Sequence, residues 1–246
     1  MKSIVIAAGT VFAATNLCHG VSVQVSVTAG SNLALAPSYG SFSSSSTGII
    51  SGGTMASAGI ESLAEDGGTA ALIGERGGLQ LFGPTFAGQT SMTVVEVSAT
   101  ENFFDFAAMI LPSNDFFVAT GGVVGPLDIT SLLNGSASSL TLVFNRMYDA
   151  GTEVEDFDFV AGGGLAGVAG QSGPNQGAAQ GANISLVDDG SNPFASFANA
   201  GGVDIAALDP ATNGPLASIT LTVVPEPSSV LLLGLGALGV FRRRRV

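Results

Sequence analysis

The sequence predicts an all-β protein, an antiparallel β-sandwich with one short helix, and three observations lead to that prediction. Several short runs alternate apolar and polar residues, as in residues 21–28, which is typical of a strand with one buried face. Turn residues such as those at 112–115 separate the runs at modest spacing. Gly and Ser are plentiful and charge is sparse, which is the composition of an exported β protein with generous loops.

The individual elements are predicted as follows. Residues 54–67 form the short helix, because their apolar side chains share one face and Gly67 suits a left-handed stop. Residues 29–46 are expected to be a loop that Leu33 and Leu35 anchor in the core, and residues 162–181 a long Gly-rich loop. The expected strands are residues 21–28, 79–82, 93–98, 103–111, 116–119, 127–129, 140–144, 184–187 and 217–224.

Charge is unevenly placed along the chain. The formal net charge is −12, but five of the seven basic residues lie at the two ends. Between residues 21 and 224, two basic residues face eighteen acidic ones, so this part carries a net charge of about −16. Such a surface repels phosphate backbones and attracts divalent cations, so we expect no nucleic-acid partner.

Residues 1–20 have the features of a secretory signal peptide. Lys2 precedes a short apolar run, and Cys18 and Gly20 place small residues three and one before a cut after Gly20. A lipoprotein anchored through Cys18 is the alternative, which the bulky Leu17 in front of it disfavours. The sequence therefore predicts transport by the secretion machinery.

Cleavage after Gly20 removes every Cys, His and Lys of the chain, and the sequence has no Trp. A Ser-His-Asp triad, a Cys-His pair, a Schiff-base lysine and a zinc site with His or Cys ligands then each lack an essential member. Disulfides are also excluded. The mature chain is thus not expected to be an enzyme of these classes.

Residues 225–246 form a tail with three ordered features. Pro225, Glu226 and Pro227 come first, an apolar run over residues 230–241 follows, and the tail ends in a basic cluster made of Arg242, Arg243, Arg244 and Arg245. The run is shorter than the roughly 20 residues of a typical membrane-spanning helix, and the arginines would keep the C-terminus on the cytoplasmic side. We expect a transmembrane sorting helix here and a folded domain over residues 21–224.

This tail resembles the PEP-CTERM sorting signal. The resemblance implies that exosortase, a membrane transpeptidase of Gram-negative bacteria that make extracellular polysaccharide, recognises and cleaves the tail near Pro225, Glu226 and Pro227. It also implies export through the inner membrane to the cell envelope, the outer surface or the extracellular matrix, with the tail in the membrane before cleavage.

Residues 146–153 follow a predicted strand and end in Asp149, Gly151, Thr152 and Glu153. Carboxylates and hydroxyls in a short loop can supply part of the oxygen shell of a calcium ion. The same residue types form ordinary solvated turns. The loop alone leaves both interpretations open.

Three segments, residues 56–67, 109–118 and 148–153, resemble the spondin domain in this order. The resemblance implies a C2-like antiparallel β-sandwich whose loops at one end bind calcium and mediate adhesion or ligand binding. Carried over residue by residue, it implies a Ca²⁺ site made by Asp115, Asp149 and Glu153. Residues 155, 156 and 158 add negative charge nearby without being named as ligands.

The leading hypothesis is an exported envelope or matrix protein with a calcium-binding adhesion domain, whose ligand is an extracellular polysaccharide or a surface protein. The alternative is a secreted hydrolase that cleaves polysaccharide with two carboxylates. With no Trp and only Tyr39 and Tyr148, the domain lacks the aromatic platforms of a sugar cleft, so the non-enzymatic hypothesis is preferred. A purely structural matrix protein is not separated from it by sequence.

Overall fold

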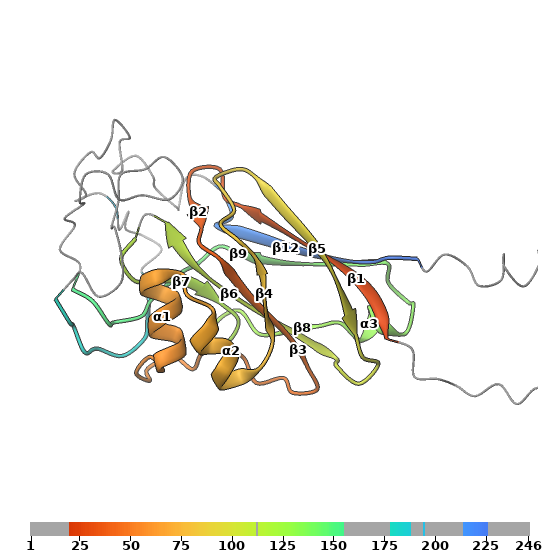
Figure 1. Ribbon diagram of the computed structural model, residues 1–246, viewed down its shortest axis with the longest axis horizontal. Coiled ribbons are helices and arrows are strands. Elements are labelled where there is room, and N and C mark those ends of the chain that lie inside the picture. Colours follow the sequence, from red (N-terminus) through yellow and green to blue (C-terminus); the bar gives the residue numbers. More distant parts are fainter. Residues whose placement is uncertain (1–19, 112, 155–177, 188–193, 195–213, 226–246) are drawn as a thin grey trace, which may run out of the picture.

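Two antiparallel β-sheets pack face to face in the computed structural model, which describes residues 20–111, 113–154, 178–187, 194 and 214–225 (Figure 1). The smaller sheet has the order β5-β1-β12-β9, and the larger follows the path β11-β10-β7-β6-β3-β4, with β2 and β8 also paired to β6. The strands are β1 (Val21–Ala29), β2 (Ala34–Leu35), β3 (Ser38–Ser43), β4 (Leu79–Phe82), β5 (Thr90–Val97), β6 (Phe103–Leu111), β7 (Phe116–Ala119), β8 (Leu127–Asp128), β9 (Ser139–Phe144), β10 (Tyr148–Asp149), β11 (Ser185–Leu186) and β12 (Ala217–Val223).

The smaller sheet follows directly from the alternation of its sequences. In β1 the residues at odd positions from Val23 to Ala29 are buried, and the Ser, Gln and Thr between them are half-exposed. Its register with both neighbours is continuous, from Val21 opposite Val97 to Ala29 opposite Ala217. A one-residue slip would turn every valine of β1 toward solvent, so burial of one face determines the register.

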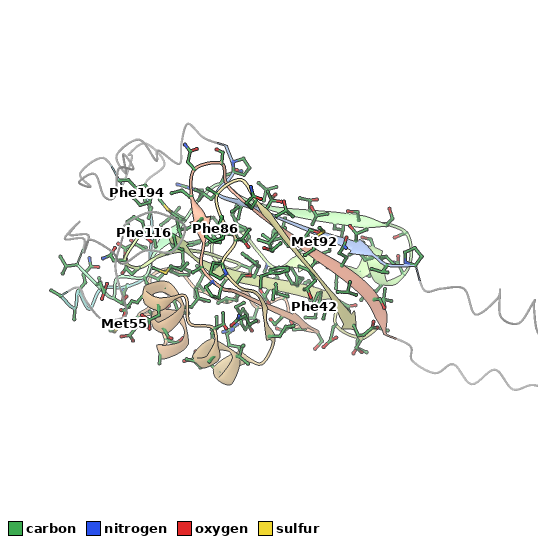
Figure 2. The ribbon with its side chains drawn as sticks, turned by 45° about the horizontal axis from the view of Figure 1, so that its top comes forward. Phe42, Met55, Phe86, Met92, Phe116 and Phe194 are labelled. Atoms are coloured by element: carbon green, nitrogen blue, oxygen red, sulfur yellow. The ribbon has the colours of Figure 1, made fainter. Side chains whose placement is uncertain are left out.

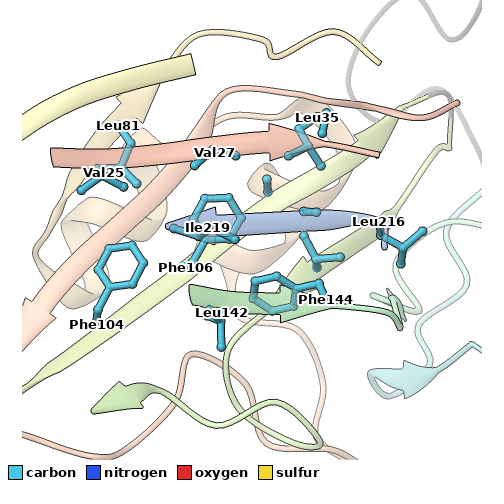
Figure 3. Packing of buried hydrophobic residues seen from close by; sticks show 14 of the residues in the cluster. Val25, Val27, Leu35, Leu81, Phe104, Phe106, Leu142, Phe144, Leu216 and Ile219 are labelled. Carbon is cyan, nitrogen blue, oxygen red and sulfur yellow. The ribbon is translucent and has the colours of Figure 1, made fainter. Parts of the chain in front are cut away.

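The main core lies between the two sheets. Figure 3 shows Val25, Val27 and Ile219 of the smaller sheet packed with Phe104 and Phe106 of β6. All five side chains have an exposed fraction of 0%. Burial of such side chains is worth about 1.5–3 kcal/mol each, so this layer is the main source of stability.

Two helices cover the other face of the larger sheet (Figure 1). Helix α1 (Ala58–Asp66) begins after Ser57, whose hydroxyl accepts from the Ile60 N–H, and ends at Gly67 with φ 66°. Helix α2 (Ala70–Arg76) follows at once, and α3 (Thr130–Leu133) is a single turn elsewhere. A second core of Leu63, Leu72, Phe117 and their neighbours joins α1 and α2 to the sheet.

The structure confirms the antiparallel sandwich and corrects several elements. The prediction of one short helix is wrong, because α2 lies on the sheet beside α1 and α3 adds one turn. The loop expected at residues 29–46 contains β2 and β3, although Leu33 and Leu35 are buried as expected. Ser and Gly in β3 hide the strand pattern, but pairing with β6 and β4 determines its conformation.

Both ends of the sandwich domain leave it side by side. Strand β1 begins and β12 ends at the same end of the smaller sheet, where Val23 lies opposite Val223. The end of β6 and helix α1 lie at the other end of the molecule (Figure 1). The predicted signal peptide and sorting helix lie outside the described residues, and within those residues no helix has the length and apolarity needed to cross a membrane.

Candidate functional site

The turn between β6 and β7 is built around Ser113. The Ser113 hydroxyl donates to the carbonyl of Ile110 (2.5 Å) and accepts from the N–H of Phe116 (3.0 Å). The Ser113 N–H also donates to the Ile110 carbonyl, at 3.0 Å. These bonds close the turn with Asn114 and Asp115 held directly before β7.

The acidic loop begins within β10 and is determined by local hydrogen bonds. The Gly151 N–H donates to Asp149 Oδ1 at 2.6 Å, an arrangement common for Asp in turns. Gly151 has φ 68°, and a Cβ there would lie 2.9 Å from the carbonyl carbon of Ala182. Glycine is therefore required by both the backbone conformation and the close approach of the neighbouring segment.

Pairing of β10 with β7 brings the turn and the loop together, because Asp149 lies opposite Phe116. Asp115 Oδ2 accepts from the N–H groups of Thr152 (3.0 Å) and Glu153 (3.2 Å), and from the Thr152 hydroxyl (3.3 Å). The Asp115 carbonyl accepts from the Ala150 N–H at 3.2 Å. One carboxylate thus organises the backbone of the loop that follows β10.

Two oxygens of the turn are buried without a hydrogen-bond partner. They are Asn114 Oδ1 and Asp115 Oδ1, in consecutive residues that are 7% and 0% exposed. The Asn114 amide is oriented by its Nδ2, which donates to the Val154 carbonyl at 3.2 Å. Because buried polar atoms are nearly always paired, two adjacent unpaired oxygens require an explanation, and a bound cation is one.

Asp149 lies next to Asp115 and titrates abnormally. Burial, followed by the negative charge of Asp115, raises the pKa of Asp149 to about 6. A hydrogen bond between the two carboxyl groups acts in the same direction, and the Gly151 N–H acts in the opposite one. Two carboxylates that repel each other in a partly buried site, shielded from solvent, are stabilised by a shared proton or by a cation.

Helix α1 adds acidic groups to the same region. Burial first, and then the charge of Glu153 among others, raises the pKa of Glu65, which is only 5% exposed. A side-chain hydrogen bond with Thr152 acts in the opposite direction, which shows that Glu65 reaches the acidic loop. Glu65 is therefore buried against the acidic loop, whereas its neighbour Asp66 is exposed.

Of the three predicted ligands, Asp115 and Asp149 have neighbouring carboxyl groups, whereas Glu153 contacts Asp115 through its backbone N–H. Glu153 is itself 3% exposed. Yet within the described residues no group of three or more His, Cys, Asp or Glu side chains is arranged to hold a metal ion. The donors are all oxygen, which suits calcium in kind. Residues 155, 156 and 158 lie outside the described part of the chain.

Sequence reasoning did not identify Asn114 and Glu65 as part of this site. Asn114 looked like a turn residue, and only the burial of the turn shows that its amide oxygen is unpaired. The signal for Glu65 was present, because α1 has an apolar face that ends in Glu65 and Asp66. The sorting residues Glu226, Pro227 and the four terminal arginines lie outside the described residues, while Pro225 is exposed just after β12.

Comparison with known proteins identifies the C-terminal segment. A family model described as the PEP-CTERM protein-sorting motif matches residues 223–245. The match begins at the last residue of β12, so the sorting signal starts where the sandwich ends. No curated protein matches the chain.

These findings define an exported β-sandwich protein of a Gram-negative bacterium. Its sorting signal is of the kind that exosortase recognises, and it directs the protein to the cell envelope or surface.

Proposed function

We propose that this exported protein binds calcium at the acidic end of its sandwich and acts there as an adhesion or ligand-binding domain of the envelope or extracellular matrix. The observation that carries the proposal is Asp115 Oδ1, which is fully buried and has no donor while Asp149 is ionised, beside the carboxyl of Asp149. Glu153 is the third proposed ligand. The spondin-like, C2-like character of the domain is part of the same proposal.

The proposal follows from the electrostatic repulsion between carboxylates that would be uncompensated without a cation. The negative charge of Asp115 raises the pKa of Asp149, and the negative charge of Glu153 raises the pKa of Glu65, so carboxyls from the turn before β7, from β10 and its following loop, and from α1 repel one another in pairs. Calcium accepts six to eight oxygen ligands and tolerates irregular geometry, so it can use carboxylate, amide and water oxygens together. Its charge would offset the repulsion between Asp115 and Asp149.

Thermal unfolding with and without calcium tests this proposal. At about 100 times its Kd, a ligand that binds only the folded state stabilises it by about 2.7 kcal/mol, which raises Tm by about 5–10 °C in a domain of this size. We expect that increase in Tm for the wild type. For Asp149→Asn, which keeps the acceptor for the Gly151 N–H, we expect an increase no more than half as large.

The matched control is Asp128→Asn, which removes one negative charge at an exposed position far from the site and keeps the acceptor for the Thr130 N–H. It should leave the calcium response unchanged. Equal responses in the wild type, Asp149→Asn and Asp128→Asn would show that Asp149 is not a ligand.

A carboxylate-dependent hydrolase remains the second candidate, because a carboxyl with pKa about 6 beside another carboxylate is a pattern of acid–base catalysis. Asp115 has no exposed surface, so a substrate would not contact it. We propose that the protein is not an enzyme. Turnover of an exopolysaccharide by the purified protein, lost in Asp149→Asn, would reverse that preference.

A further inference from the structure

We propose that strand β5 is the surface through which two copies of this chain pair edge to edge. The smaller sheet ends at β5, and within the described residues β1 is the one strand that pairs with it. Half of the backbone N–H and C=O groups of an edge strand point away from the sheet, so a further strand is the natural partner of such an edge.

Strand β5 lacks the features that usually protect an edge. Protected edges carry Lys, Pro, bulges or inward charges, or they are short. Strand β5 has eight residues, no Lys, Arg or Pro, and an uninterrupted register with β1 from Thr90 to Val97. Its single charge is Glu96 near one end, and that carboxylate accepts from the hydroxyl of Ser22.

Exposed apolar side chains gather along the same edge. Phe86 (49% exposed), Met92 (63%) and Val94 (53%) lie on β5 or on the loop that enters it, and they are three of the seven large hydrophobic residues exposed in the described part. Figure 2 shows Phe86 and Met92. Strands β1 and β12 inside the sheet present hydroxyls and a glutamine on that face, and Thr220 of β12 is hydrogen-bonded to Thr141 of the other edge strand, β9. The exposed apolar side chains of this face thus lie on its edge strands, two of them on β5 and Val143 on β9.

Charge and side-chain matching favour a second copy as the occupant. Antiparallel pairing about a two-fold axis at Thr93 places Met92 of each copy opposite Val94 of the other, and such cross-strand pairs are stabilising. Each Glu96 then lies opposite Thr90 of the other copy, which supplies a hydroxyl as Ser22 does. The two Glu96 charges are six residues apart along the strand, about 20 Å, well beyond the screening length of about 8 Å.

The two-fold axis also determines how the copies are oriented. It turns one copy end over end, so the two ends of β12, where the sorting signal begins, lie at opposite ends of the pair. In each copy the acidic region lies at the end remote from the end of β12 (Figure 1), so the acidic regions of the two copies also lie at opposite ends of the pair and their repulsion does not oppose pairing.

Sedimentation of the full chain in mild detergent tests the pairing. We expect a monomer–dimer equilibrium that depends on protein concentration, and dimerisation at least tenfold weaker in Val94→Lys. The matched control is Val143→Lys, because Val143 is also an exposed valine (41%) but lies on β9 at the opposite edge of the same sheet. A wild type that stays monomeric at all concentrations, or equal weakening by the two variants, would overturn the proposal.

Disulfide formation tests the register. In a Cys18→Ser background, Met92→Cys and Val94→Cys chains should form a disulfide-linked dimer when mixed and oxidised, and neither should do so alone. The dimer is read on a non-reducing gel. Cross-linking of Met92→Cys to Val143→Cys instead would show head-to-tail pairing of β5 with β9 and would overturn the two-fold arrangement.

Discussion

Asp105 is a buried carboxyl on β6, on the face of the larger sheet that α1 and α2 cover. Its neighbours Phe104 and Phe106 face the other sheet, so alternation along the strand turns Asp105 toward the helices. The Thr120 hydroxyl donates to Asp105 Oδ1 and itself accepts from the Phe106 N–H at 3.2 Å. The group is polar, 4% exposed and fully integrated in the fold.

This position predicts a measurable pH dependence. Burial raises the pKa of Asp105, and the Thr120 hydrogen bond and the charge of Arg76 lower it less. Because the folded state holds the proton more tightly than the unfolded chain, the free energy of unfolding falls as pH rises from the ordinary pKa of about 4 through the raised value. Asp105→Asn keeps the acceptor for Thr120, so Tm should fall less between pH 4 and 7 than in the wild type.

Asp128→Asn is the opposing control for that measurement. The Thr130 hydrogen bonds lower the pKa of Asp128, so ionisation of Asp128 stabilises the fold as pH rises. Asp128→Asn removes that contribution, so it cannot make the fall in Tm between pH 4 and 7 smaller. An Asp105→Asn curve that parallels the wild-type curve from pH 4 to 7 would show that Asp105 titrates normally in the folded state.

At the scale of elements, the candidate site depends on two-residue strands that are weak alone. Strand β10 is held between β7 and β11, with Tyr148 opposite Phe117 on one side and Leu186 on the other. The Tyr148 hydroxyl accepts from the Val123 N–H at 2.8 Å, and its ring packs on Phe117. These contacts hold Asp149 beside Asp115.

Gly151 is the position where this arrangement can be tested by a backbone change. We expect Gly151→Ala to lower the free energy of unfolding by about 2 kcal/mol, because φ 68° strains alanine and its Cβ would press on Ala182. Gly74→Ala, inside α2 with open space around the new Cβ, should instead raise it by about 0.5–1 kcal/mol. Urea unfolding measures both, and a neutral Gly151→Ala would contradict the tight contact.

At the scale of the whole molecule, the two sheets place the sorting signal and the acidic site at opposite ends (Figure 1). The sorting signal begins at Val223, so few residues separate the end of the sandwich from the apolar run that starts at Val230. At about 3.3 Å per extended residue, this spacer reaches about 20 Å. The acidic site therefore lies at the end of the sandwich remote from the residue where the sorting signal begins.

A substitution in the sorting motif should prevent cleavage of the C-terminal tail. We expect Glu226→Ala to keep the uncleaved chain in the inner membrane, since exosortase recognises the motif, while the thermal stability of the sandwich is unchanged. Mass measurement of the product from each fraction checks this. Normal processing of Glu226→Ala would show that the motif glutamate is not needed.

Much of the sandwich could be predicted because alternation is a local signal. The limits of β6 and β7, and nearly those of β1 and β12, follow from apolar runs bounded by turn residues. Strand β3 and helix α2 could not be predicted in this way, because Ser38, Gly40 and Ser41 in β3 and Gly74 in α2 carry weak local preferences. Pairing and packing with distant segments decide their conformation.

The sequence by itself determined the sorting signal, the lack of His, Cys and Lys beyond residue 20, and the acidic character of the domain, because each depends on residue types and their order. Only the tertiary structure placed Asp115 beside Asp149, buried Glu65 and left Asn114 Oδ1 unpaired. It also left β5 at the edge of a sheet. Burial and unpaired groups arise where segments far apart in the chain meet, and no local pattern records which segments those are.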